Sequence, residues 1–144
     1  MNALAAAALA AGELICEFSD GYRKSLLADI AGDPPRTELV LVFEAVRGRG
    51  AEVLSSRQPG RRKVQVIPAG EHLHFIQSEG PSVRVTTLTG CLRTRVRSDG
   101  EVCTRFSAQH AWHFDATAHV DPEAALRRLP SGAASGVCEP WKVE

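Results

Sequence analysis

The stretch that decides the fold runs from Gly90 to Asp115 and reads Gly-Cys-Leu-Arg-Thr-Arg-Val-Arg-Ser-Asp-Gly-Glu-Val-Cys-Thr-Arg-Phe-Ser-Ala-Gln-His-Ala-Trp-His-Phe-Asp. Ser98, Asp99 and Gly100 lie near its middle, and a three-residue loop with glycine at a positive φ is a common hairpin connection. Apolar and polar residues alternate on both sides of this loop, which is typical of strands with one buried face. The stretch therefore predicts two antiparallel strands.

Two registers are open to this hairpin. The tight register, with the three-residue loop, would hold Cys91 and Cys103 roughly 13 Å apart along the strands, and a disulfide needs Cα atoms within about 7 Å. A looser register sets Cys91 opposite Cys103 and Arg93 opposite Glu101, and we expect this one because it pairs cysteines and charges together. An even slip keeps the same inner face, so both registers predict one face that can be buried, formed by Leu92, Thr94, Val96, Val102, Thr104 and Phe106. The other face holds Arg93, Arg95, Arg97 and Arg105.

The rest of the chain also reads as short strands separated by turn residues. The strongest is the almost continuous apolar run Thr37–Val46, and further strands are expected over residues 13–18, 52–55, 63–67, 71–77, 82–88 and 136–143. Strands at this spacing predict a barrel or a sandwich, so we expect an all-β fold of about eight mostly antiparallel strands. Asp121 followed by Pro122 is a helix start signal and predicts a short C-terminal helix over about residues 122–129.

The N-terminal residues 1–11 differ from this pattern because they are uncharged and rich in alanine. Ala8-Leu9-Ala10 fits the small-residue cleavage site of a signal peptide, although the basic segment that opens such a signal is missing. We interpret residues 1–11 as a signal-peptide remnant or, alternatively, as a disordered or alanine-rich helical segment, in either case outside the packed domain. Residues 12–144 are then expected to form a single β domain.

Export makes disulfides the natural interpretation of the four cysteines, which include no Cys-x-x-Cys pair. The alternative is a cytosolic protein with four buried thiols. We expect Cys16 to pair with Cys138, because closing a barrel or sandwich brings the terminal strands together. We expect Cys91 to pair with Cys103, because they flank a single turn.

Histidines supply the candidates for a metal site. His72 and His74 would share one face of a strand, which suits a metal ion, whereas His110 and His113 have opposite parity and reach one ion only across a bulge. Asp115 follows closely after His113. The alternative is that these are ordinary surface or core histidines. The metal candidates are therefore His72, His74, His110, His113 and Asp115.

Strand alternation also predicts which residues of the second strand lie in the core. If Phe106 faces inward, then His110, Trp112 and Phe114 do so too, while His113 is exposed.

The basic residues are dispersed rather than concentrated. Residues 57–62 are expected to form an exposed basic loop. The arginines of the hairpin, together with Arg57, Arg61 and Arg62 of this loop and Lys63 next to it, could form a surface for an anionic partner. The 17 basic and 17 acidic residues give a net charge of zero, which favours a solvated strand face and makes a nucleic-acid partner unexpected. No catalytic motif is visible, and no cofactor is expected.

The segment Cys16–Gly21 resembles the opening strand of small periplasmic β-barrel inhibitors of c-type lysozyme, which also carry a disulfide near their ends. The inhibitor loop of that family has no counterpart in this chain, so no functional residue is transferred. The sequence itself favours a periplasmic or secreted, disulfide-stabilised, non-enzymatic binding module for a protein or small ligand, without a membrane span. The alternative is a metal-binding protein or hydrolase that uses the histidines.

Overall fold

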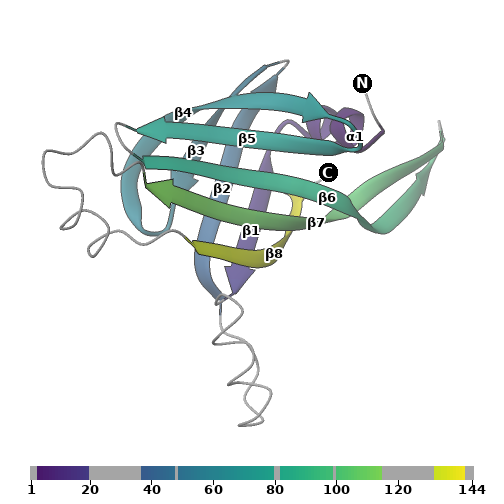
Figure 1. Cartoon of the computed structure of the whole chain (residues 1–144). Helices are drawn as coiled ribbons and strands as arrows, with labels where there is room; N and C mark the ends of the chain where they lie inside the picture. Colours follow the sequence, from purple (N-terminus) through teal and green to yellow (C-terminus); the bar gives the residue numbers. More distant parts are fainter. Residues whose placement is uncertain are drawn as a thin grey trace, which may run out of the picture.

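The computed structural model describes residues 3–19, 37–47, 49–79, 82–98, 100–114 and 132–141. Within these residues, eight antiparallel strands form a closed barrel in chain order, and one short helix precedes them (Figure 1). The elements are α1 (Ala3–Ala11), β1 (Leu14–Ser19), β2 (Thr37–Arg47), β3 (Gly50–Ser55), β4 (Gln58–Ala69), β5 (His72–Glu79), β6 (Ser82–Arg97), β7 (Gly100–Phe114) and β8 (Gly132–Pro140).

This architecture confirms the predicted all-β fold and decides between its two forms, because β1 pairs with β8 and the sheet closes. The predicted helix over residues 122–129 lies outside the described residues. The exposed basic loop expected over residues 57–62 is wrong for most of its length. Ser55 already pairs with Gln58, so only Ser56 and Arg57 form the turn and the remaining residues continue into β4.

The core is built from the inward-facing residues of all eight strands. Its largest members are four phenylalanines, Phe18, Phe43, Phe75 and Phe106, each almost completely buried. Phe43 and Phe75 stack across the interior with ring centroids 4.2 Å apart. Since burial of one such side chain contributes about 1.5–3 kcal/mol, these rings and the surrounding Leu and Val residues supply most of the drive for closing the barrel.

The barrel closes at the seam, which we define as the pairing of β1 with β8. Cys16 lies directly opposite Cys138 and forms a disulfide with it, and both residues are completely buried. Gly136 lies opposite Phe18, and a Cβ atom at Gly136 would overlap the backbone carbonyl of Glu17. The two strands therefore approach so closely here that only glycine fits.

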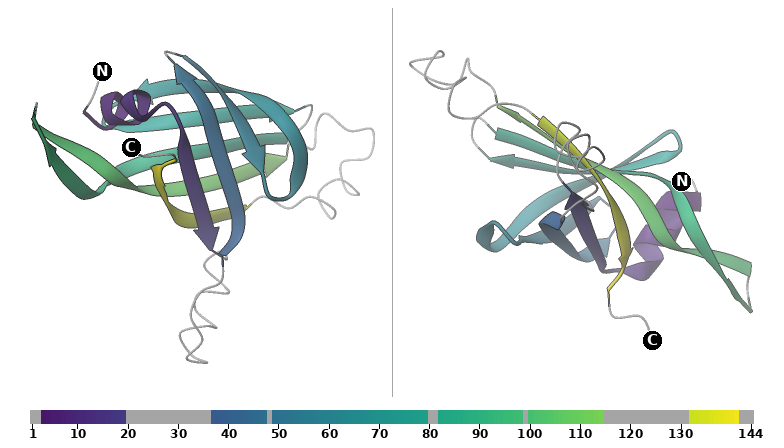
Figure 2. Two further views of the ribbon diagram at one scale, coloured as in Figure 1. Left: turned by 180° about the vertical axis from the view of Figure 1, so that it is seen from behind. Right: turned by 90° about the horizontal axis from the view of Figure 1, so that it is seen from below.

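Beyond the barrel, β6 and β7 continue as a two-stranded arm that projects into solvent (Figures 1 and 2). We call this arm, residues 91–97 of β6 and 100–105 of β7, the ribbon. Pairing of β6 with β5 stops at Leu88, and pairing of β7 with β8 stops at Phe106. The two strands of the ribbon therefore have only each other as neighbours in the sheet.

Both registers predicted for the hairpin are wrong. Arg97 pairs with Gly100 and Thr94 with Cys103, and three register shifts interrupt the ladder. The bulges insert unpaired residues and increase the local twist. Cys91 and Cys103 are therefore not paired in the ladder, yet they lie close enough to form the predicted disulfide. The predicted inner face is also wrong for the ribbon: Leu92 and Val96 are 57% and 77% exposed, because the barrel ends before it could cover them.

Helix α1 lies at the end of the barrel from which the ribbon projects (Figure 2). Ala8 is completely buried, and Ala7, Leu9 and Ala11 pack against the core. The chain then enters β1 through Gly12, whose carbonyl accepts a hydrogen bond from the backbone N–H of Val46 at 2.9 Å. In this structure the small alanine side chains let α1 approach the barrel end closely, and the interpretation of residues 1–11 as a signal-peptide remnant or a disordered or helical segment stays a prediction.

Candidate binding groove between the helix and the ribbon

A groove of about 760 Å³ separates α1 from the base of the ribbon. Three alanines, Ala6, Ala7 and Ala10, line it on the helix side. Opposite them lie Val102 and the disulfide between Cys91 and Cys103. Its size lies within the range of about 300–1,000 Å³ that is usual for small-molecule sites.

The ribbon wall of the groove is held in place by covalent and hydrogen bonds. The Cys91–Cys103 disulfide joins the two strands with Cα atoms 5.9 Å apart. Thr89 and Ser107 share a hydrogen bond of 2.8 Å between their hydroxyl groups at the base of the ribbon, and the hydroxyl of Ser107 also donates to the carbonyl of Gly90 at 3.4 Å. The wall is therefore preformed, which reduces the ordering cost of binding a ligand.

The polar groups of the groove are few. Glu71, from the turn between β4 and β5, and Glu101, from the ribbon, are its two ionisable lining residues, and both are exposed. The hydroxyl groups of Thr89 and Thr94 add hydrogen-bonding capacity. An apolar surface with a small number of polar groups at fixed positions is the usual composition of a ligand site.

At the other end of the barrel, His110 and Thr86 are buried polar residues of the interior. They are 3% and 2% exposed, and His110 Nδ1 shares a hydrogen bond of 2.8 Å with the Thr86 hydroxyl. Burial lowers the pKa of His110 to about 4, and the positive charges of Arg84 and Arg57 act in the same direction. His110 is therefore uncharged at neutral pH and serves as a hydrogen-bonded part of the core beside Phe18, whose ring lies 5.4 Å away.

The other metal candidates lie elsewhere. His72 and His74 lie on the outer surface of β5, with ring centroids 6.4 Å apart, and His74 shares a hydrogen bond of 2.8 Å with Thr87. His113 is exposed, as predicted, and lies opposite Val83 in the ladder. His74 pairs with Thr87 and His113 pairs with Val83, both on β6. These two β6 positions are four residues apart, roughly 13 Å along the strand.

Asp115 lies outside the described residues. Among the residues that are described, no group of three or more His, Cys, Asp or Glu side chains is arranged to hold a metal ion. The prediction for Trp112 is also corrected: it is half-buried rather than in the core, because it lies near the end of β7, opposite Arg84. The side chain of Phe114 lies outside the described set.

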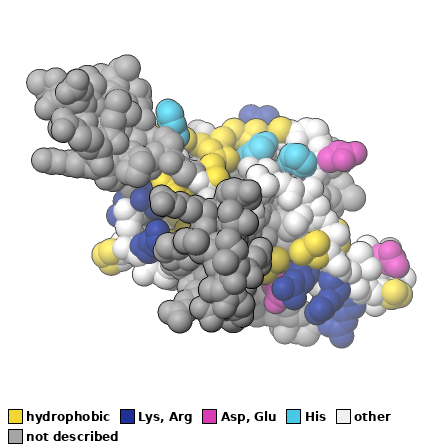
Figure 3. All heavy atoms as spheres, turned by 60° about the horizontal axis from the view of Figure 1, so that its bottom comes forward, with side chains coloured by type: hydrophobic (Ala, Val, Ile, Leu, Met, Phe, Trp, Pro, Cys, Tyr) yellow, Lys and Arg dark blue, Asp and Glu magenta, His cyan; other side chains and the backbone are white. Residues whose placement is uncertain are grey.

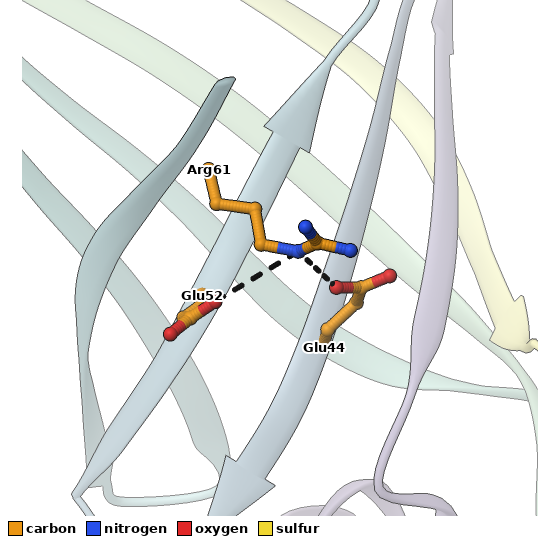
Figure 4. A network of polar contacts seen from close by, with 3 residues as sticks. All are labelled: Glu44, Glu52 and Arg61. Carbon is orange, nitrogen blue, oxygen red and sulfur yellow. Dashed lines mark hydrogen bonds and ion pairs between the residues drawn. The ribbon is translucent and has the colours of Figure 1, made fainter.

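The basic surface expected from the sequence is divided in the structure. Arg61 extends from β4 toward two carboxylates, at 2.8 Å from Glu44 and 3.9 Å from Glu52 (Figure 4). Arg62 is half-buried, and Lys63 is exposed beside it. Of the basic residues of β4, Arg61 is thus compensated by carboxylates, whereas Arg93, Arg95 and Arg97 recur along the β6 strand of the ribbon.

Sequence reasoning missed the groove because its two walls come from α1 and the ribbon, which are far apart in the chain and show no shared motif. In the described part of the chain, no helix has the length and apolar character that crossing a membrane requires. No protein-family model matches this chain, and no curated protein or solved structure gives a match to it.

Proposed function

We propose that this protein is an exported, non-enzymatic binding module that holds a small, largely apolar ligand in the groove between α1 and the ribbon. The observation that carries the proposal is the groove itself. It combines a suitable volume, alanine side chains on one wall and a disulfide-linked strand pair on the other. Such a site needs little rearrangement to accept a ligand.

Export is supported by the two disulfides, since such bonds persist in secreted and periplasmic proteins and are rare in the cytosol. Both pairs of cysteines are joined, and the described chain contains no free cysteine. The proposal treats α1 as part of the mature protein, because Ala8 packs in the core. A mature N-terminus after Ala11, measured by intact mass on protein from the native host, would remove one wall of the site.

The alternative of a histidine-based metal protein or hydrolase has less support. Its candidates in the described residues divide among the interior, where His110 lies, and separate positions on the outer surface, where His72, His74 and His113 lie. A catalytic site needs its groups within hydrogen-bonding reach of one reacting atom.

Titration with an uncharged fluorescent probe, N-phenyl-1-naphthylamine, tests the groove. Ala10 is exposed on the groove wall, so Ala10→Phe should occupy the site without disturbing the core. We expect this variant to reduce probe affinity roughly tenfold or more, since that corresponds to about 1.4 kcal/mol. Ala111 is exposed on β7 outside the groove, and Ala111→Phe is the matched control. Equal affinities for the two variants would contradict the proposal.

A further inference from the structure

The ribbon exposes side chains that soluble proteins usually cover. Leu92 and Val96 are the two most exposed large hydrophobic residues among those the structure describes. Every described residue from 91 to 98 is exposed, so the β6 strand of the ribbon adds almost nothing to the core, whereas Cys103 on the β7 strand packs against it. An isolated pair of strands is marginally stable in water, and here a disulfide holds the pair together at its base. A protruding, cross-linked element without a role in folding calls for a role in recognition.

The ribbon also carries cations that no acidic side chain of the described residues neutralises. Arg93, Arg95 and Arg97 recur at every second position of β6, about 6.6 Å apart. Arg95 and Arg97 lie in the regular part of the ladder and point to one face, and Arg93 precedes them between two register shifts. In the described part of the chain no ion pair involves these three side chains. Arg105 lies directly opposite Arg93, a like-charge pairing that is unfavourable across strands, and it contacts Glu139 at 3.4 Å.

Figure 3 shows Lys and Arg side chains gathered toward the ribbon side of the molecule, with exposed hydrophobic side chains near them. Glu101 pairs with Val96 in the ladder and so lies on the face opposite the arginine row. Val96 shares that opposite face with Glu101, so the cationic and the exposed aliphatic side chains lie on the two sides of the β6 edge, which pairs with no other strand beyond Leu88. The complement of this edge is an anionic surface that can also accept aliphatic side chains.

We propose that the ribbon docks the protein onto an anionic phospholipid surface through the unpaired edge of β6, with Arg93, Arg95 and Arg97 on lipid phosphates and with Leu92 and Val96 at the boundary of the acyl chains. Interfacial membrane binding combines these two features, buried apolar side chains and attraction of Lys or Arg to anionic lipids. Long arginine side chains reach phosphates while their stems lie along apolar surface. This inference does not depend on the groove holding a ligand.

Two other partners fit the ribbon less well. Single-stranded nucleic acid is bound through aromatic side chains on which bases stack, and residues 91–103 contain no aromatic residue. Protein interfaces are anchored by Trp, Tyr and Arg, and Leu and Val are under-represented among their energetic centres. The combination of arginine with leucine and valine, without an aromatic residue, favours a lipid surface.

Co-sedimentation of the full, oxidised chain with phospholipid vesicles tests the proposal. Binding is expected to vesicles that mix phosphatidylglycerol with phosphatidylcholine, and not to vesicles of phosphatidylcholine alone. Each arginine near an anionic surface strengthens binding to the vesicles. Replacing all three, Arg93→Gln, Arg95→Gln and Arg97→Gln, should therefore weaken vesicle binding roughly a hundredfold. Leu92→Ser with Val96→Ser should weaken it roughly tenfold and leave its salt dependence unchanged.

The matched control changes the same amount of charge away from the ribbon. Arg47, Arg49 and Lys63 are exposed on the barrel, and their joint replacement by glutamine should alter affinity by no more than about threefold, because salt screens charges beyond about 10 Å. Near-ultraviolet circular dichroism of all variants should match that of the parent, since every replaced side chain is exposed.

Three results would overturn the proposal. The first is the absence of binding to anionic vesicles at low salt. The second is equal binding by the ribbon variant and the barrel control. The third is full competition by soluble polyphosphate together with no effect of Leu92→Ser and Val96→Ser, which would identify a site for soluble polyanions instead of a lipid surface.

Discussion

The two disulfides of this protein join neighbouring antiparallel strands in opposite surroundings. Cys16 and Cys138 are completely buried at the seam and lie 122 residues apart in sequence. Cys91 and Cys103 lie 12 residues apart, and Cys91 is exposed at the base of the ribbon. The first bond joins strands that the core already holds together, whereas the second joins strands that little else holds.

This difference separates a region held by burial from one held by a cross-link, and it leads us to assign stability to the first and to propose recognition for the second. At the seam, burial and the disulfide act together, so an error there should affect the whole barrel. In the ribbon, the disulfide holds two strands that are little buried. A substitution in the ribbon should therefore affect local order and recognition, and not the stability of the barrel. Four predictions test this division, from the largest expected effect to the smallest.

Removal of the seam disulfide should have the largest effect. In the chain-entropy model a bond closing 122 residues contributes about 5 kcal/mol and one closing 12 residues about 3 kcal/mol. Cys16→Ala with Cys138→Ala should therefore lower the free energy of unfolding by about 5 kcal/mol in urea titrations.

The matched variant, Cys91→Ala with Cys103→Ala, should lose less than about 3 kcal/mol, because the ribbon can open without the barrel. Hydrogen exchange should then accelerate in residues 91–105 and stay unchanged in β1 and β8. An equal global loss in both double variants would contradict the division.

Glycine replacement compares the two regions without touching the disulfides. A Cβ atom at Gly136 would overlap the Glu17 carbonyl and lie 2.7 Å from Cδ1 of Phe18. Because backbone cannot move aside cheaply, Gly136→Ala should cost about 3 kcal/mol or more in thermal or urea unfolding.

At Gly90, next to the ribbon, a Cβ atom would meet only the Ser107 hydroxyl, at 3.2 Å, and this side chain can shift by a few tenths of an ångström while keeping its hydrogen bond to Thr89. Gly90→Ala should therefore change the free energy of unfolding by less than about 1 kcal/mol. A similar cost at both glycines would show that the seam is no more constrained than the ribbon.

Acid should weaken the barrel interior through His110, which lies on β7 opposite Ala134 of β8. Its pKa is about 4 in the folded protein and about 6.5 in the unfolded chain, so between these values the unfolded state binds more protons. The contribution of His110 to the free energy of unfolding is therefore fully present above about pH 6.5 and is lost as the pH falls toward 4. About 2 kcal/mol is lost between pH 7 and pH 5.

Urea titrations at the two pH values check this expectation in the parent and in His110→Gln, in which the difference should shrink by about 2 kcal/mol. His113 is exposed, and His113→Gln should keep the full pH dependence. A His110→Gln variant as sensitive to acid as the parent would exclude His110 as the cause.

The smallest effect is expected on the outside of the ribbon. Because Leu92 and Val96 are already exposed, Leu92→Ser with Val96→Ser should change the free energy of unfolding by less than about 0.5 kcal/mol. Leu14 is completely buried beside the seam, and Leu14→Ala should cost about 2–5 kcal/mol in the same assay. A loss of more than about 1 kcal/mol in the ribbon variant would place Leu92 or Val96 in the core.

The sequence by itself determined the fold class. Apolar alternation and turn residues are local signals, and they predicted the strands, the inward orientation of His110 and the exposure of His113. The disulfide pairing could be predicted as well, because in a closed sheet the first and last strands meet and because a hairpin brings nearby cysteines together.

Only the tertiary structure decided where the barrel ends along β6 and β7. Apolar and polar residues alternate around Leu92 and Val96 as they do in a buried strand. Whether the apolar side chains are covered depends on β5 and β8, whose pairing with β6 and β7 stops before it reaches the ribbon. The register of the ribbon depended on bulges, which have no clear sequence signal here. The groove required α1 to lie beside the ribbon, a contact between distant segments that is set by packing at the barrel end and not by the local preferences of either segment.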